Sequence, residues 1–197
     1  MSARLSIYIF FNAVSPEGSV SVSPLNMVFN RGDNVTLNCS AQGGPGNTYQ
    51  WQRSGTDLDN ETMQTLAITQ ISALDGGEYT CVVSNAAGSG SASTLLNVSP
   101  EIVIDPTDVS ARNGTVHTLV CEAEAFPEPQ YQWMRVSGTF GENVAGVDNN
   151  VLVFTPVRFG DAGEYYCIAT SNGHSVESNT STLIGIFLLH TIICLSK

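Results

Sequence analysis

The chain has 197 residues, of which 42% are hydrophobic and only 13% are charged. This composition excludes a disordered polyelectrolyte, and the length allows one large domain or two small ones, each with its own core. Seven Lys and Arg stand against eighteen Asp and Glu, giving a formal net charge of −11, and the single lysine is Lys197. Binding to a nucleic acid or to an anionic membrane surface requires clustered cations on the protein. This chain has too few Lys and Arg residues to form such a cluster, so both are excluded as partners.

The first half of the chain contains short β-type segments around Cys39, Trp51 and Cys81. These alternating, β-branched runs are separated by clusters of Gly, Pro, Asn and Asp, a pattern typical of strands and turns in an all-β domain. A Tyr-Gln-Trp-x-Arg segment occupies residues 49–53, and Asp-x-Gly-Glu-Tyr-x-Cys occupies residues 75–81.

The second half repeats this pattern. Trp133 follows Cys121 by 12 residues, as Trp51 follows Cys39, and both motifs recur, at residues 131–135 and 161–167. The chain is therefore an internal duplication of two domains of roughly 85 residues each. No cysteine pair has the CxxC spacing that begins a tetrahedral zinc site.

Both halves resemble immunoglobulin domains of the I-set or C2-like type, whose signature is Cys, then Trp, then Asp-x-Gly-x-Tyr-x-Cys. The resemblance covers roughly residues 16–186 and implies an all-β fold of two tandem Greek-key immunoglobulin-like sandwiches. The two cysteine separations, 42 and 46 residues, are too short for the two extra strands of variable-type domains.

The resemblance assigns a role to each repeated residue. It implies one disulfide in each domain, covered by a core tryptophan, and a tyrosine corner whose hydroxyl bonds to upstream backbone. The residues concerned are the disulfides Cys39–Cys81 and Cys121–Cys167, the core residues Trp51 and Trp133, and the corner residues Tyr79 and Tyr165. Disulfides persist outside the reducing cytosol, so we expect a secretory-pathway protein at the cell surface.

We expect domain 1 over residues 16–99 and domain 2 over residues 100–186, joined by a short linker, Ser99-Pro100-Glu101. In domain 2, Asn172-Gly173 favours a tight type I′ hairpin, which we expect to be shorter than the matching hairpin of domain 1.

Two interpretations of residues 1–15 remain open. A short apolar run before Ala13-Val14-Ser15 suits a signal peptide, whereas residues 11–17 resemble residues 96–101 and suit the stub of an upstream immunoglobulin domain. Residues 187–197 form an apolar tail, for which a truncated membrane segment is the preferred interpretation, with Cys194 unpaired.

Two kinds of surface site are predicted. Arg31-Gly32-Asp33 lies in an expected turn and matches the tripeptide that integrins recognise, although an ordinary glycine turn explains the same residues. Six Asn-x-Ser/Thr sequons are candidates for N-glycosylation: Asn34, Asn38, Asn60, Asn97, Asn113 and Asn179.

No motif of an enzyme, cofactor site or metal site is present in the sequence, so we expect a non-catalytic protein with no cofactor and no small-molecule substrate. The resemblance implies cell adhesion through contact with another protein, either a second copy or another cell-surface receptor, in a protein attached to the plasma membrane. Two alternatives remain: the ligand-binding ectodomain of an immunoglobulin-containing receptor kinase or phosphatase, and a structural matrix or muscle-type array.

Overall fold

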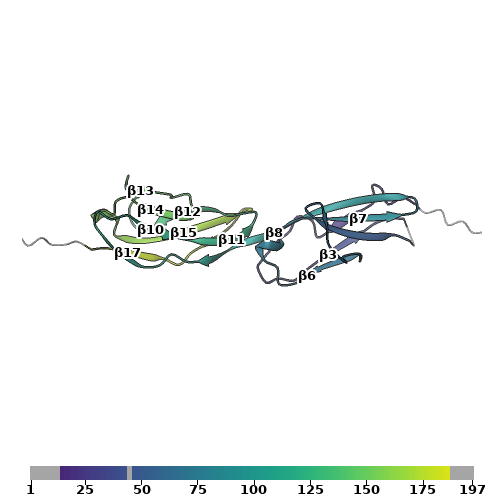
Figure 1. Cartoon of the computed structure of the whole chain (residues 1–197), viewed down its shortest axis with the longest axis horizontal. Coiled ribbons are helices and arrows are strands. Elements are labelled where there is room, and N and C mark those ends of the chain that lie inside the picture. The colour runs from purple at the N-terminus through teal and green to yellow at the C-terminus, as the bar shows by residue number, and fades with distance from the viewer. Residues whose placement is uncertain (1–13, 44–45, 187–197) are drawn as a thin grey trace, which may run out of the picture. The chain divides into compact units, whose positions relative to one another are not determined.

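The computed structural model describes residues 14–43 and 46–186, and these residues are almost entirely β-strand and turn (Figure 1). They divide into two compact units with a boundary between Asn97 and Val98. The expected all-β sandwich class is confirmed. In the described part of the chain, no helix is long and apolar enough to cross a bilayer. The predictions for residues 1–13 and 187–197 lie outside it.

The first unit packs a small sheet against a larger one. The small sheet consists, in order, of β1 (Ser21–Ser23), β3 (Val35–Ser40) and β6 (Thr65–Ile68). The larger sheet consists, in order, of β8 (Gly88–Ile104), β7 (Gly77–Asn85), β4 (Thr48–Arg53) and β5 (Thr56–Asp57), with β2 (Val28–Phe29) paired to β8. A short 3₁₀ helix, Ala73–Asp75, precedes β7.

Alternation of apolar and polar residues places the core of the first unit. In β3, Val35, Leu37 and Cys39 are buried, and the three residues that alternate with them are exposed. On the facing sheet, Trp51 lies opposite Cys81 in the β4–β7 register, and both are fully buried. The period of two expected from the sequence therefore turns the repeated Cys and Trp residues inward.

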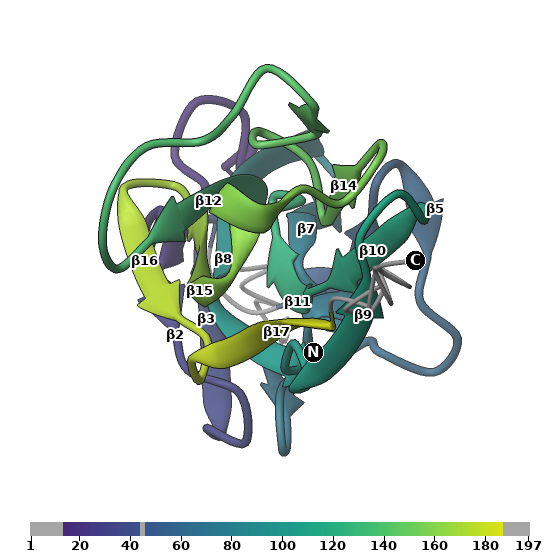
Figure 2. The same cartoon turned by 90° about the vertical axis from the view of Figure 1, so that its left-hand side faces the viewer.

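The second unit has the same plan. One sheet consists, in order, of β10 (His117–Val120), β14 (Val151–Phe154) and β13 (Val144–Ala145), and β11 (Glu122–Phe126) pairs with residues 98–104 of β8. The other sheet consists, in order, of β12 (Gln130–Arg135), β15 (Gly163–Ser171), β17 (Ser181–Ile186) and β9 (Val109–Arg112), with β16 (His174–Glu177) paired to β15. Figure 2 shows β17 beside β9, to which it is parallel. The 3₁₀ helix Phe159–Asp161 precedes β15.

The hairpins that follow the second cysteine of each unit have loops of equal length. Asn85 pairs with Gly88, and Ser171 pairs with His174, so two residues close each loop. Asn172 and Gly173 both have positive φ, 48° and 79°, which confirms the predicted type I′ conformation. The expectation of a shorter second hairpin is wrong, because both loops contain two residues. In the first loop the Asn85 side chain accepts a hydrogen bond from the backbone N–H two residues later.

The three residues predicted to form a linker are extended and belong to β8. Glu101 pairs with Glu124 of β11, so this segment is part of a strand ladder of the second unit.

Candidate protein-binding face

Each unit is built around one disulfide. Cys39–Cys81 joins β3 to β7 with a Cα–Cα distance of 6.3 Å, and Cys121–Cys167 joins the segment between β10 and β11 to β15 with a distance of 6.5 Å. All four cysteines are fully buried. They link the two sheets of each sandwich and form part of the scaffold.

A buried tryptophan lies in each of these cores, and both are 0% exposed. The Trp51 indole N–H donates to the Met63 carbonyl at 3.0 Å, and that of Trp133 donates to the Asn149 carbonyl at 2.9 Å. Each indole therefore satisfies its only polar atom and fixes a surface loop to the core.

The two predicted corner tyrosines make the same contact. The Tyr79 hydroxyl donates to the Asp75 carbonyl at 2.8 Å, and the Tyr165 hydroxyl donates to the Asp161 carbonyl at 2.5 Å. Burial raises the pKa of both tyrosines above the ordinary value of 10.0. The positive charge of a nearby arginine, Arg53 or Arg135, lowers the pKa of the tyrosine in its own domain, and the negative charge of Asp75 or Asp161 raises it.

Sequence reasoning assigned no role to the arginine that ends each Tyr-Gln-Trp-x-Arg segment. The guanidinium carbon of Arg53 lies 5.7 Å from the centre of the Tyr79 ring, and that of Arg135 lies 5.5 Å from the centre of the Tyr165 ring. Both distances are typical of a cation–π contact. The recurrence of arginine at the same place in both halves was the available signal.

The outer face of the second unit carries side chains that its core does not use. Met134 of β12 lies opposite Tyr166 of β15, and Gln132 lies opposite Ile168 two residues along the same strands. Met134 is 38% exposed, and both β15 side chains alternate with fully buried neighbours. Side chains of Met, Tyr and Ile thus adjoin one another on the outside of the sheet.

The same sheet carries a second group of exposed apolar residues, which the outward pair Glu164 and Thr182 separates from Tyr166. On β17, Ile184 is 53% exposed and lies next to Ser110 of β9, and Ile186 lies next to Arg112. We call the outward side chains of β12, β15 and β17 the outer face; its apolar members are Met134, Tyr166, Ile168, Ile184 and Ile186.

The first unit has polar residues at the positions that match Met134 and Tyr166. Gln52 and Thr80 are paired in the β4–β7 register as Met134 and Tyr166 are in the second unit. The Thr80 hydroxyl lies 2.8 Å from that of Ser93 on β8, so this face carries a polar hydrogen-bonded pair. The two domains share a core and differ on this surface.

A family model for the immunoglobulin domain matches residues 18–85 and 99–171. The chain belongs to the immunoglobulin domain family. This confirms the resemblance seen in the repeated Cys, Trp and Tyr-x-Cys motifs, and the two matched regions fall on the two structural units.

Similar proteins carry immunoglobulin domains in larger chains. Human hemicentin-1 is 33% identical over 173 residues, which cover 83% of this chain and 3% of that protein. Neural cell adhesion molecule 1-A of Xenopus laevis is 27% identical over 167 residues, covering 75% of this chain and 15% of that protein. A solved titin fragment, A168169, has a TM-score of 0.63 at 21% identity over 85% of this chain and 99% of that fragment, a likeness of fold. The chain thus spans a small part of its curated relatives.

Five of the six sequon asparagines are exposed on these immunoglobulin domains, and none of the six lies on β12, β15 or β17. Asn97 differs, since it is only 3% exposed and its side-chain amide donates to the Met27 carbonyl. The side-chain amide of Asn179 donates to Asp105 at 2.8 Å. The exposed sequon asparagines are Asn34, Asn38, Asn60, Asn113 and Asn179.

The Arg31-Gly32-Asp33 tripeptide is exposed in the turn between β2 and β3. Gly32 has a φ of 86° and donates its N–H to the Ile71 carbonyl at 2.8 Å. The Asp33 carboxylate accepts from the Asn30 N–H at 2.9 Å, which closes the turn. The aspartate therefore has a structural role in the turn, and recognition by an integrin stays a prediction.

Proposed function

We propose that this chain is the recognition part of an extracellular, non-catalytic adhesion protein, and that it binds another protein through the outer face of the second domain. The immunoglobulin family and the adhesion molecule among its relatives support the general role. The two disulfides support an oxidising, extracellular location.

The pairing of Met134 with Tyr166 carries the proposal. Both residues occupy the variable position of a repeated motif, and the first domain has Gln52 and Thr80 there. Because these Met and Ile side chains are already about half buried, covering the rest of each stabilises a complex by about 0.5–1.5 kcal/mol before the costs of association. An apolar patch on a sheet face without sequons is suited to contact with another protein.

Charge determines how such contact depends on salt. Residues 17–99 carry two Arg against seven acidic residues, and residues 100–185 carry three Arg against eleven. Two copies therefore repel each other at long range, so apolar self-association strengthens as salt screens the repulsion. Binding to a partner with a basic face instead weakens as the salt concentration rises, because salt screens the attraction between opposite charges.

The test uses the full chain on beads and in sedimentation, in salt solutions whose Debye lengths run from about 30 Å to about 3 Å. We expect clustering that increases with salt and is lost in M134Q/Y166T, which carries apolar-to-polar changes toward the first domain. The matched control V116T removes an apolar side chain that is 63% exposed in the connection between β9 and β10, and it should cluster like the parent.

Equal clustering by M134Q/Y166T and the parent would overturn the assignment to this face. A chain that stays monomeric at every salt concentration would remove the form with a second copy. In that case the parent, M134Q/Y166T and V116T would each be tetramerised, and their binding to cells would be compared. Loss of cell binding by M134Q/Y166T alone would support another cell-surface receptor as the partner.

A further inference from the structure

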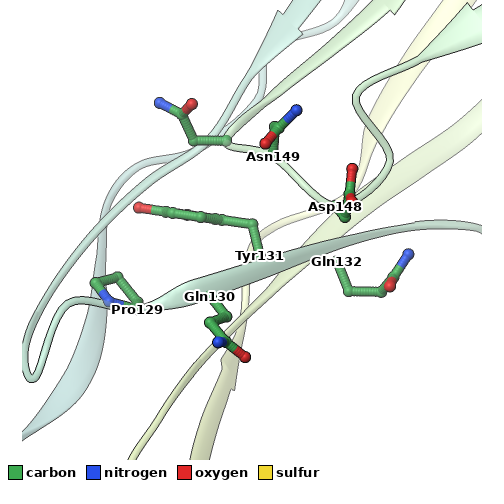
Figure 3. Close-up of a pocket in the computed structure, with 7 residues that line it drawn as sticks. Pro129, Gln130, Tyr131, Gln132, Asp148 and Asn149 are labelled. Carbon is green, nitrogen blue, oxygen red and sulfur yellow. The ribbon is translucent and has the colours of Figure 1, made fainter.

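The second domain contains a hollow of about 580 Å³, and none of the five apolar members of the outer face lines it. It lies between the start of β12 and the loop that leads into β14 (Figure 3). Its lining residues are Pro129, Gln130, Tyr131, Gln132, Asp148 and Asn149, together with Asn150.

The loop wall of this hollow is held by the core. The Trp133 indole donates to the Asn149 carbonyl, and the backbone N–H of Trp133 donates to the Val147 carbonyl at 2.6 Å. The Cys121 N–H donates to the Asn150 carbonyl at 2.9 Å. The loop backbone is thus fixed by the tryptophan and by a disulfide cysteine.

The side chains of this wall are available to a ligand. Asp148, Asn149 and Asn150 are exposed, and their side chains make no hydrogen bond within the described residues. Gln132 donates its amide to the Val147 carbonyl at 3.1 Å, which leaves its side-chain oxygen as an acceptor beside them. The fixed backbone lowers the conformational cost of binding, and the uncommitted side chains leave donors and acceptors for a ligand.

An aromatic ring forms the centre of the hollow. Figure 3 shows the Tyr131 ring between Pro129 and Asn149. Its hydroxyl accepts from the Ala123 N–H at 2.9 Å and lies 3.3 Å from the Ala123 carbonyl, so the ring is held at its far end. The ring therefore offers a fixed aromatic surface beside the amide side chains.

From this arrangement we propose that the hollow binds a neutral pyranose sugar at the end of a glycan. Each sugar hydroxyl both donates and accepts hydrogen bonds, as the Asn and Gln carboxamides do. The C–H face of a pyranose is complementary to the negative face of an aromatic ring. One carboxylate, Asp148, and no cation line the hollow, so sulfated and other anionic sugars are disfavoured.

The first domain provides an internal comparison. The backbone carbonyls of Met63 and Gln64 accept from the Trp51 indole and the Cys39 N–H, respectively. The carbonyls of Asn149 and Asn150 accept from the Trp133 indole and the Cys121 N–H in the same way. Met63 is 68% exposed and apolar, and the Gln64 amide donates back to the Cys39 carbonyl. The same backbone thus carries sugar-compatible side chains in one domain only.

The experiment uses full-length chain secreted into an oxidising compartment without N-glycosylation, so that its own glycans do not compete. The probes are mannobiose, lactose, chitobiose and maltose, with sialyllactose as the anionic probe, followed by ¹H–¹⁵N NMR titration. We expect saturable shifts of the Asn149 and Asn150 side-chain amides with at least one neutral disaccharide, at a dissociation constant on the order of 1 mM, and no such shifts with sialyllactose.

The variant N149M/N150Q carries the residues of the first domain, and it should bind at least about tenfold more weakly through the loss of hydrogen bonds. The reciprocal M63N/Q64N and the outer-face variant M134Q/Y166T should bind like the parent, which separates this proposal from the adhesion function. Equal binding by N149M/N150Q and the parent, or no saturable shift with any neutral disaccharide, would overturn the sugar site.

Discussion

Arg135 lies over the ring of Tyr165, with its guanidinium carbon 5.5 Å from the ring centre. The same guanidinium donates from Nη2 to the Gly160 and Ala162 carbonyls, at 2.6 and 2.9 Å, and from Nη1 to the Thr139 carbonyl at 2.9 Å. One side chain thus ties the turn before β15 to the end of β12, and the tyrosine ring packs against it. This contact stabilises the end of the sheet that presents the outer face.

Replacing Arg135 with lysine should lower the free energy of unfolding of the second domain by about 2 kcal/mol, because an ammonium cannot reach three carbonyls in the planar geometry of a guanidinium. Urea denaturation followed by tryptophan fluorescence measures the change. The control R112K alters an exposed residue on β9 and should stay within about 0.5 kcal/mol of the parent. Equal stability of R135K and the parent would show that the carbonyl contacts are dispensable.

The tyrosine corners predict a loss of stability at alkaline pH. Burial raises the pKa of Tyr79 and Tyr165 in the folded state, so above pH 10 the unfolded chain ionises while the folded corners stay neutral. Stability from these groups is therefore complete below pH 10 and falls as pH rises through the folded pKa. Urea denaturation across this pH range should show the decline.

The variant Y165F removes one of the two groups and separates its two effects. At pH 7 it should lose about 1 kcal/mol with the hydroxyl bond to Asp161, and above pH 10 its stability should decline less steeply than that of the parent. Parallel decline in the two proteins would show that Tyr165 does not contribute to the pH dependence.

Each buried tryptophan should be essential to its own domain. Trp133→Ala should destabilise the second domain by about 3–5 kcal/mol, since it removes a fully buried indole and the bond to the Asn149 carbonyl. Trp51→Ala is the matched change in the first domain. Differential scanning calorimetry should show each variant losing one transition, and a variant that melts like the parent would contradict the core placement.

Glycan occupancy should follow burial of the sequon. Asn97 is buried, and its amide donates to Met27, so a glycan there would require the strand to leave the sheet. Glycopeptide mass spectrometry of protein secreted from animal cells should find Asn97 unmodified and glycans at the exposed turn sites Asn60 and Asn113. A fully occupied Asn97 in folded protein would contradict the position of that residue.

The sequence by itself determined the core of this protein. The repeated spacing of Cys39, Trp51 and Cys81 predicted two sandwiches through its resemblance to immunoglobulin domains, and the period of two along each strand turns these residues inward. The tyrosine corner was likewise predictable, since its partner lies four residues upstream in the same motif.

Only the tertiary structure decided which surfaces are candidates for binding. Met134 and Tyr166 stand at the variable positions of two separate motifs, and nothing in either motif states that they face one another. Tyr131 and Asn149 likewise share a hollow only because the Trp133 indole draws the later loop onto the core. Burial follows from local period, whereas a surface site requires cross-strand register and loop placement, which depend on contacts distant in the chain.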